Sequence, residues 1–204
     1  LGIPFSMGAH AYDLFRQGGD WLLHEKFMHA SIIRTSSNSS ANRLKEIGLD
    51  QDKIKVIRRG LTNWPNREHY GLHYSRKLKL ISVGRLVEKK GYFHLLQIMK
   101  LLLEREICNF QMSIVGHGPL KAGLEKEIYR LGLYGKVELV GAKSEEEVGK
   151  LLIESDIMLF TGIVASNGDR DGIPNVIPEA MSVGLLVLAS SYAGASEAFL
   201  DGVS

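Results

Sequence analysis

The stretch DGIPNVIPEAM, Asp171 to Met181, sets two carboxylates in a D-x7-E arrangement, Asp171 and Glu179. Carboxylates accept charge-assisted hydrogen bonds, so acids at the two ends of a crevice could hold the hydroxyls of an extended polyhydroxyl ligand. Asp171 precedes the helix that this stretch is expected to begin, and Glu179 falls inside its early turns. Alternatively, both acids only complement the positive end of that helix, and the pattern gives the two interpretations about equal weight.

The backbone of the same stretch has a chemistry of its own. Asn175 is expected to cap the helix, and Pro178 is tolerated in a first turn, where N–H groups have no helical partner. The free amides and the positive end of the helix dipole favour a phosphate. The sequence therefore predicts that this loop-to-helix junction can hold an anion.

Two cations follow an earlier apolar run. In KLKLISVGRLVEKKG the run ends at Gly84, and Arg85 and Lys90 come shortly after it. Arg offers a planar fork and Lys a compact charge, and both bind phosphate. A solvated basic turn explains the pair about as well. A G-x-G-x-x-G loop is absent after this strand, which argues against a Rossmann oxidoreductase.

The histidines give weaker signals. GHGP, Gly116 to Pro119, allows close backbone approach by a ligand, but a tight turn explains it equally well, and His117 is typical of a surface residue. His10 precedes Tyr12 and Asp13 just after a strand-like segment and could line a cleft; taken alone, it is interpreted as structural. The histidines share no metal-ligand spacing, so we expect no metal.

These residues need a scaffold that brings them together. From Leu78 onward, short apolar runs alternate with amphipathic helical patterns, which is typical of a parallel sheet covered on both faces. Strands are expected at 77–84, 110–116, 136–141, 156–162 and 185–190, and Ser144 with Glu147 predicts a capping box on one of the helices. Ligands of such sheets bind at the carboxyl ends of the strands. The predicted fold class is α/β, a Rossmann-like parallel sheet with helices on both faces.

The first seventy residues have a different pattern. A helix is expected at 21–30, a strand at 31–36, a capped helix at 36–48 and a strand at 54–60. The polar stretch 61–77 has little periodicity and is the predicted linker between domains. GIPFS resembles an interrupted strand, and the chain stops at DGVS where another strand should follow. We therefore expect an excised piece of a longer protein.

Composition excludes several classes of protein. The chain has 204 residues, 45% hydrophobic and 24% charged, which is enough to bury a core. The net charge is +2 with acids and bases interleaved, so no nucleic-acid surface is predicted. The single Cys108 excludes an intramolecular disulfide and fits a reducing compartment. No apolar run is long enough for a membrane span and no signal peptide opens the chain, so we expect a cytoplasmic protein.

Several motifs in their order along the chain resemble the retaining glycosyltransferases of family four: AHAYD, GRLVEKKG, IVGHGP, VELVGAKS and the D-x7-E stretch. The polar run NGDRDGIPN is most similar to the bacterial exopolysaccharide and colanic-acid branch. The resemblance implies the two-domain GT-B architecture. Residues 71–204 would be the nucleotide-sugar-binding Rossmann-like domain, truncated at its C-terminus, and residues 1–70 a remnant of the N-terminal acceptor domain with the linker.

The resemblance also implies a role for each side chain. Arg85 and Lys90, beside Gly84, would hold the donor diphosphate and stabilise the leaving group. Asp171 would contact the hydroxyls of the donor sugar, and Glu179 those of the ribose. His10 would approach the donor sugar from the N-terminal domain. These residues would make the chain part of a hexosyltransferase.

Loops would complete the implied donor site. The backbone from Gly172 through Ile173 and Pro174 to Asn175 would cradle phosphate or sugar, and Ala142 and Lys143 would lie near the base. Transfer to a saccharide or lipid-linked saccharide would retain the anomeric configuration and need no metal or cofactor, because Arg and Lys offset the charge of the departing diphosphate. Lipid-linked acceptors leave room for peripheral association of the full-length protein with the inner face of the membrane.

The sequence departs from the family pattern at several positions. The first acid is usually Glu, and Asp171 is one methylene shorter. Thr161-Gly162 replaces a common Pro-Ser, and AGASEA replaces Gly-Gly-Ile-Pro-Glu while keeping the acid at Glu197. Because the acceptor domain is almost wholly missing, we expect the chain to bind a donor but not to transfer sugar. The alternative is a non-catalytic sugar-nucleotide-binding module.

Overall fold

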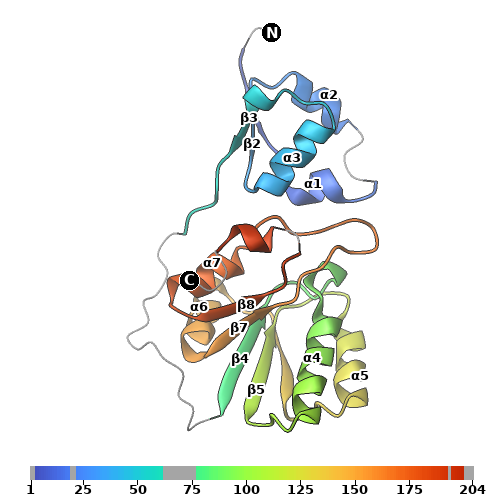
Figure 1. Ribbon diagram of the computed structural model, residues 1–204, viewed down its shortest axis with the longest axis vertical. Coiled ribbons are helices and arrows are strands. Elements are labelled where there is room, and N and C mark those ends of the chain that lie inside the picture. The colour runs from blue at the N-terminus through green and yellow to red at the C-terminus, as the bar shows by residue number, and fades with distance from the viewer. Residues whose placement is uncertain (1–2, 19–21, 62–76, 193, 200–204) are drawn as a thin grey trace.

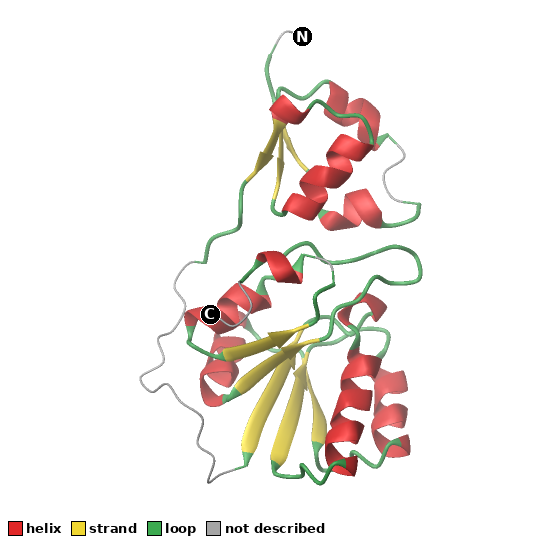
Figure 2. Cartoon of the chain, viewed as in Figure 1, coloured by secondary structure: helices red, strands yellow, loops and turns green. Residues whose placement is uncertain are grey.

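The computed structural model describes residues 3–18, 22–61, 77–192 and 194–199, and it contains two parallel sheets (Figure 1). The smaller sheet has three strands in the order β1-β2-β3, and the larger has five in the order β6-β5-β4-β7-β8. Figure 2 shows helices packed on both sheets. The predicted α/β class with parallel strands is therefore confirmed.

The strands and helices fall close to where periodicity places them. The strands are β1 (Ser6–Gly8), β2 (Ile32–Thr35), β3 (Ile54–Val56), β4 (Leu78–Val83), β5 (Phe110–Val115), β6 (Val137–Gly141), β7 (Ile157–Phe160) and β8 (Leu186–Ala189). The α-helices are α1 (Ala11–Phe15), α2 (Leu23–Met28), α3 (Asn38–Glu46), α4 (Tyr92–Glu104), α5 (Lys121–Arg130), α6 (Glu145–Glu154) and α7 (Val176–Ser182). Short 3-10 turns are η1 (Gln51–Lys53), η2 (Glu88–Lys90) and η3 (Ala195–Glu197). None of the helices described is long and apolar enough to cross a bilayer.

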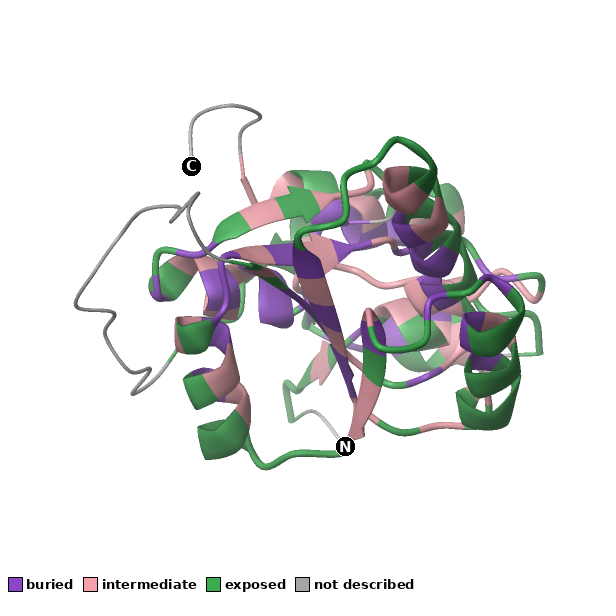
Figure 3. Cartoon of the chain, turned by 90° about the horizontal axis from the view of Figure 1, so that it is seen from below, coloured by how far each residue is buried: buried purple, intermediate pink, exposed green. Residues whose placement is uncertain are grey.

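The larger sheet buries both of its faces, because successive side chains of a strand point to opposite sides. In β4, Leu80 packs in a core formed with α4 and α5, while the next residue, Ile81, packs in a core formed with α6 and α7. Figure 3 shows buried residues concentrated along the central strands. A third core lies between the smaller sheet and the helices α1 to α3.

Local capping fixes where α6 begins. Ser144 Oγ accepts a hydrogen bond from the Glu147 N–H at 3.3 Å, and the Glu147 carboxylate accepts one from the Ser144 N–H at 2.8 Å. The backbone hydrogen bond from Ser144 is the main cause that lowers the pKa of Glu147 to about 2. The predicted capping box is confirmed.

The strand order fixes where a ligand can approach the larger sheet. The chain runs outward from β4 through β5 and β6, then returns to the other side of β4 as β7 and continues to β8. The order therefore reverses between β4 and β7, and open parallel sheets bind ligands at the carboxyl end of such a reversal. Arg85 follows β4 there, and the loop 161–175 follows β7.

Some boundaries differ from those predicted. The expected strand at 54–60 ends at Val56, and β1 begins only at Ser6, the last residue of GIPFS. Pro4 has no N–H to donate to a neighbouring strand, which accounts for the later start. The N-terminal residue of the helix expected at 21–30, nearly all of the linker at 61–77, and the domain boundary at residue 70 lie outside the described residues.

Candidate functional site

Asp171 lies against two lysines at the carboxyl edge of the larger sheet. Lys90 Nζ is 2.7 Å from Asp171 Oδ2, and Lys89 Nζ is 3.4 Å from Asp171 Oδ1. The Lys90 and Asp171 side chains are only 14% and 15% exposed, so water and salt screen their attraction less than that of a surface pair. The structure thus brings together Lys90 and Asp171, which the sequence proposes for one site.

One oxygen of Asp171 keeps an unfilled acceptor position. Lys90 approaches Asp171 Oδ2 closely but without hydrogen-bond geometry. This oxygen and Thr35 Oγ1 are the two buried side-chain polar atoms that lack a hydrogen-bond partner within the part of the chain the structure describes. Buried polar atoms are normally satisfied, and a water molecule or a ligand group is one way to satisfy such an atom.

The loop after β7 is tied to the turn that carries the lysines. Lys89 Nζ donates to Asp169 Oδ1 at 3.0 Å, and the Ser166 N–H and hydroxyl both donate to the Glu88 carboxylate at 2.8 Å. These contacts hold the loop 163–170 beside η2 and fix the approach to Asp171. The sequence reasoning missed Lys89 and Asp169, although Asp169 in the polar SNGDR run and the lysines of the EKK turn have opposite charges.

Gly91 sets the position of Lys90. Its backbone is left-handed (φ 67, ψ 24), and it ends η2 and begins α4. A Cβ at this position would overlap the carbonyl oxygen of Thr161, so only glycine allows β7 to approach so closely. The Thr161 hydroxyl lies 3.2 Å from the Lys90 carbonyl oxygen and 3.1 Å from that of Gly91, and it donates to this pair.

Arg85 lies nearby but apart from the acids. The Tyr92 hydroxyl donates to the Gly84 carbonyl at 3.0 Å, and burial raises the pKa of Tyr92, so the hydroxyl remains a donor. This contact fixes the backbone just before Arg85. The Arg85 side chain is exposed and has no ion pair with a described residue. The structure therefore does not bring Arg85 into contact with Asp171.

A cavity of about 610 Å³ lies between the smaller sheet and the loop leading to α7. Asp171 lines it from one side together with Gly172, Ile173 and Asn175, and His10 lines it from the end of β1. The backbone N–H of His10 donates to the Asp13 carboxylate at 3.0 Å, and the exposed imidazole has its Nδ1 3.6 Å from the same carboxylate at the start of α1. Other predicted residues are not part of its wall: Gly84, Arg85, Lys90, Ala142, Lys143, Pro174 and Glu179.

The prediction that the Asn175 side chain caps α7 is wrong. Asn175 occupies the N-cap position, but its backbone is helical (φ −56, ψ −35) and its side chain makes no capping hydrogen bond. A cap side chain bonds the N–H two or three residues ahead, and Pro178 has no N–H at the third position. Pro178 therefore removes one possible partner, and the other, the N–H of Ile177, donates to the Pro174 carbonyl at 3.1 Å.

The loop after β6 is more exposed. Ala142 and Lys143 both lie at the surface, and Lys143 Nζ is 3.2 Å from the Glu147 carboxylate on α6. Such a surface pair contributes little to stability, so Lys143 can change partners readily. The structure places both residues at the same carboxyl edge as Arg85 and Asp171, since all follow parallel strands of one sheet.

Replacing Glu179 by glutamine is expected to raise the free energy of unfolding at pH 7. Burial is the main cause that raises the pKa of Glu179, with the charge of Glu145 adding to it and Arg59 opposing it. Ionisation of Glu179 therefore opposes folding above its folded-state pKa, and the cost disappears below the unfolded-state pKa. Urea unfolding of both proteins should show a difference that shrinks as the pH falls toward 4; a difference independent of pH would contradict this explanation.

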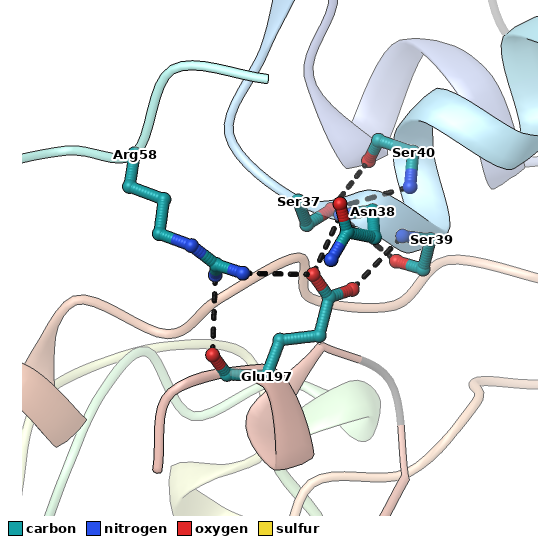
Figure 4. Close-up of polar contacts among 6 residues, drawn as sticks. All are labelled: Ser37, Asn38, Ser39, Ser40, Arg58 and Glu197. Atoms are coloured by element: carbon teal, nitrogen blue, oxygen red, sulfur yellow. Dashed lines mark hydrogen bonds and ion pairs between the residues drawn. The ribbon is translucent and has the colours of Figure 1, made fainter.

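Glu197, in η3 after β8, contacts α3 and Arg58, which belong to the part of the chain with the smaller sheet. Its carboxylate accepts hydrogen bonds from the N–H groups of Asn38 at 2.6 Å and Ser39 at 2.8 Å, in the first turn of α3 (Figure 4). Arg58, beyond β3, donates to the Glu197 carbonyl at 3.1 Å and lies 3.7 Å from its carboxylate. The acid thus satisfies helix amides that α3 cannot satisfy internally. Sequence reasoning noted this acid only as one kept in AGASEA.

Comparison with known sequences gives matches over most of the chain. The model of the glycosyl transferases of group 1 matches residues 67–204. An amylovoran biosynthesis glycosyltransferase of Erwinia amylovora, AmsK, is 36% identical over 180 residues, which are 87% of this chain and 44% of that protein. A putative colanic acid biosynthesis glycosyltransferase of Escherichia coli, WcaL, is 31% identical over 171 residues, 84% of this chain and 42% of that protein. The chain thus spans less than half the length of these relatives.

Solved structures show the same fold at lower identity. The Anabaena protein Alr3699/HepE, in complex with UDP and glucose, superposes with a TM-score of 0.76 at 21% identity, covering 98% of this chain and 56% of that one. Staphylococcus aureus TarM, in complex with UDP and saccharide ligands, gives 0.74 at 16% identity, covering 93% of this chain and 38% of that one. These likenesses confirm the expected GT-B fold.

Proposed function

The chain belongs to the glycosyl transferases of group 1, and from that premise we propose that it binds the donor of a retaining sugar transfer, a nucleotide-diphosphate sugar. The acceptor would be a polysaccharide or a lipid-linked saccharide. Relatives named for amylovoran and colanic acid biosynthesis support such an acceptor, and the UDP and glucose held by a protein of the same fold support such a donor.

One observation carries the proposal: the Asp171 carboxylate lies at the cavity wall with two lysines beside it and one acceptor position unfilled. An ammonium group has three donors, so Lys90 can contact Asp171 and a phosphate oxygen together. The unfilled position on Asp171 Oδ2 suits a sugar hydroxyl, which donates strongly to a carboxylate. Phosphate and sugar would then meet at the carboxyl end of β4.

The other residues surround that point in the proposed site. Arg85, exposed after β4, would close on the diphosphate from solvent and stabilise it as a leaving group. Glu179, held half-buried with a raised pKa, would accept the ribose hydroxyls. His10 would face the donor sugar from the smaller sheet. The backbone of Gly172 to Asn175 would contact phosphate or sugar, and Ala142 and Lys143 would border the base. The charges of Arg85 and Lys90 offset that of the diphosphate without a metal.

Titration calorimetry of the chain with UDP, GDP and their glucose and mannose derivatives tests this function. We expect one nucleotide to bind, and Arg85→Gln to weaken it by about tenfold, since hydrogen bonds to charged groups contribute roughly 1.5–3 kcal/mol. Arg130→Gln is the matched control, because Arg130 is exposed on α5 and pairs with Glu127, outside the cavity. Failure of both nucleotides to bind, or equal affinity of the Arg85 and Arg130 variants, would overturn the donor site.

A further inference from the structure

The loop 163–170, which follows β7, folds back on itself. The Ala165 N–H donates to the Asp169 carbonyl at 2.8 Å, and the Gly168 N–H donates to the Ala165 carbonyl at 2.8 Å. The Asn167 side-chain oxygen accepts a hydrogen bond from the Asp169 N–H at 3.0 Å. Because these bonds close the loop across few residues, a contact on one side of the loop also fixes the position of its other side.

One side of the loop is tied to η2, the turn that carries Lys90. Asp169 accepts a hydrogen bond from Lys89 at 3.0 Å. The Ile163 N–H donates to the Lys89 carbonyl at 2.9 Å. The loop therefore supports the turn from which Lys90 approaches Asp171 at 2.7 Å.

The other side of the loop contacts the end of α1, in the part of the chain with the smaller sheet (Figure 1). The Gln17 N–H donates to the Asn167 carbonyl at 2.8 Å. The guanidinium carbon of Arg170 lies 4.4 Å from the centre of the Phe15 ring, within the range of a cation–π contact. Arg170 directly precedes Asp171, so the loop connects Phe15 to the acid of the proposed donor site.

The loop comes closest to α1 at Gly168. The Gly168 backbone is left-handed, with a φ of +80, and a Cβ there would be 2.6 Å from the Phe15 carbonyl oxygen. Glycine satisfies both conditions, since it has no Cβ and adopts a positive φ without strain. The sequence of the loop is therefore suited to lie directly against the last residue of α1.

The helix α1 connects this contact to His10. It has five residues, with His10 at its N-cap and Phe15 as its last residue, so the two ends move together. His10 and Arg170 line the same cavity as Asp171. Fixing Phe15 against the loop therefore restricts where His10 can lie relative to Asp171.

We propose that the loop 163–170 braces α1 and thereby places His10 at the donor sugar, with Arg170 as a positioning residue that acts through Phe15. The inference rests on the proposed function, since it takes the donor to be held by Lys90 and Asp171 and His10 to face its sugar. The turn that binds the diphosphate and the helix that carries His10 are then parts of one arrangement, joined by the loop.

The first test is a calorimetric titration of Arg170→Gln with whichever nucleotide binds and with its glucose and mannose derivatives. We expect the affinity for the bare nucleotide to stay unchanged. The additional affinity contributed by the sugar should fall about fivefold, as expected for the loss of a cation–π contact. Arg170→Lys keeps the charge but loses the planar stacking on Phe15, so it should recover only part of that affinity.

The second test observes His10 directly by proton NMR. The imidazole signals of His10 are identified by their absence in His10→Gln. In the wild-type chain they should shift when the nucleotide sugar replaces the bare nucleotide, and in Arg170→Gln the shift should be smaller. Urea unfolding of the same samples shows that the variants are folded, so that a change in the signal reports the position of His10.

A double-mutant cycle with Phe15→Leu separates positioning from direct contact with the ligand. If Arg170 acts through Phe15, each single variant should lose the same affinity for the sugar and the double variant should lose no more. Arg16→Gln is the matched control, because Arg16 lies 4.8 Å from the centre of the Tyr12 ring in the same helix. It should change neither the affinity nor the His10 signals.

The outcomes distinguish this inference from the function on which it rests. If neither nucleotide binds, the proposed function fails and the inference fails with it. If a nucleotide sugar binds but the Arg170 and Arg16 variants behave alike, the inference is wrong and the donor site stands. Additive losses in the double variant, or a weaker affinity of Arg170→Gln for the bare nucleotide, would mean that Arg170 contacts the ligand itself and would overturn the positioning role.

Discussion

Replacing Lys90 by glutamine is expected to weaken binding of the nucleotide sugar by about a hundredfold, near the upper end of what a hydrogen bond to a charged group contributes. Lys90 is mostly buried, lies 2.7 Å from Asp171 and has its ammonium group 5.2 Å from the centre of the Phe160 ring. A neutral side chain removes the charge that offsets the diphosphate and leaves Asp171 with Lys89 alone. Calorimetric titration against the wild-type chain measures the loss.

Replacing Asp171, the acid beside Lys90, should affect the binding of the bare nucleotide and of the nucleotide sugar differently. Asp171→Asn removes a negative charge beside the diphosphate, so the bare nucleotide should bind as well as before or better. The additional affinity contributed by the sugar should be lost, because the amide is a weaker acceptor than the carboxylate.

Lys100→Gln, on the surface of α4 beside Glu104, is the control for Lys90. If the Lys90 and Lys100 variants bind the nucleotide sugar equally, Lys90 has no part in the donor site.

Gly91→Ala is expected to destabilise the part of the chain that contains the larger sheet strongly. Left-handed backbone costs a non-glycine residue roughly 1–2 kcal/mol. The new Cβ would also overlap the Thr161 carbonyl, so β7 or η2 must move, and the total loss should exceed about 3 kcal/mol. Urea unfolding measures it.

The chain contains a matched control for that experiment. Gly132 has the same φ of +67, but a Cβ there meets no atom within 4 Å. Gly132→Ala should therefore cost only the backbone term, on the order of 1 kcal/mol. The difference between the two variants isolates the contact between Gly91 and Thr161. Equal losses in the free energy of unfolding would show that β7 moves away from the added methyl group at no cost.

The larger sheet was predictable because its signals are local. Each strand is a short apolar run and each helix an amphipathic one. The hydrophobic period therefore identifies them without knowledge of the elements they pack against. The capping box at Ser144 and Glu147 involves residues of one turn. Lys90 and Asp171 are distant in sequence, but both follow strands of one parallel sheet, and that rule alone places them at the same edge.

The features that sequence reasoning missed depend on the tertiary structure. Glu197 caps α3 from a position 159 residues away from Asn38. No local pattern around Asn38 indicates which carboxylate binds its N–H. Lys89 was overlooked beside Lys90, since only the fold shows that it contacts Asp169 as well. The Asn175 side chain does not cap α7 because Pro178 has no N–H and the N–H of Ile177 already donates to the Pro174 carbonyl.

The contact between Glu197 and α3 also has a consequence for the order of events during synthesis. Asn38 and Glu197 are 159 positions apart, so a chain emerging from the ribosome presents the amides of α3 long before the acid that satisfies them. Until then the N–H groups of Asn38 and Ser39 lack this carboxylate, whereas the N–H of Ser40 already has the Ser37 hydroxyl as a partner. The contact between η3 and α3 can therefore form only after the segment that carries Glu197 has been synthesised, and such a contact between residues distant in sequence forms late in folding.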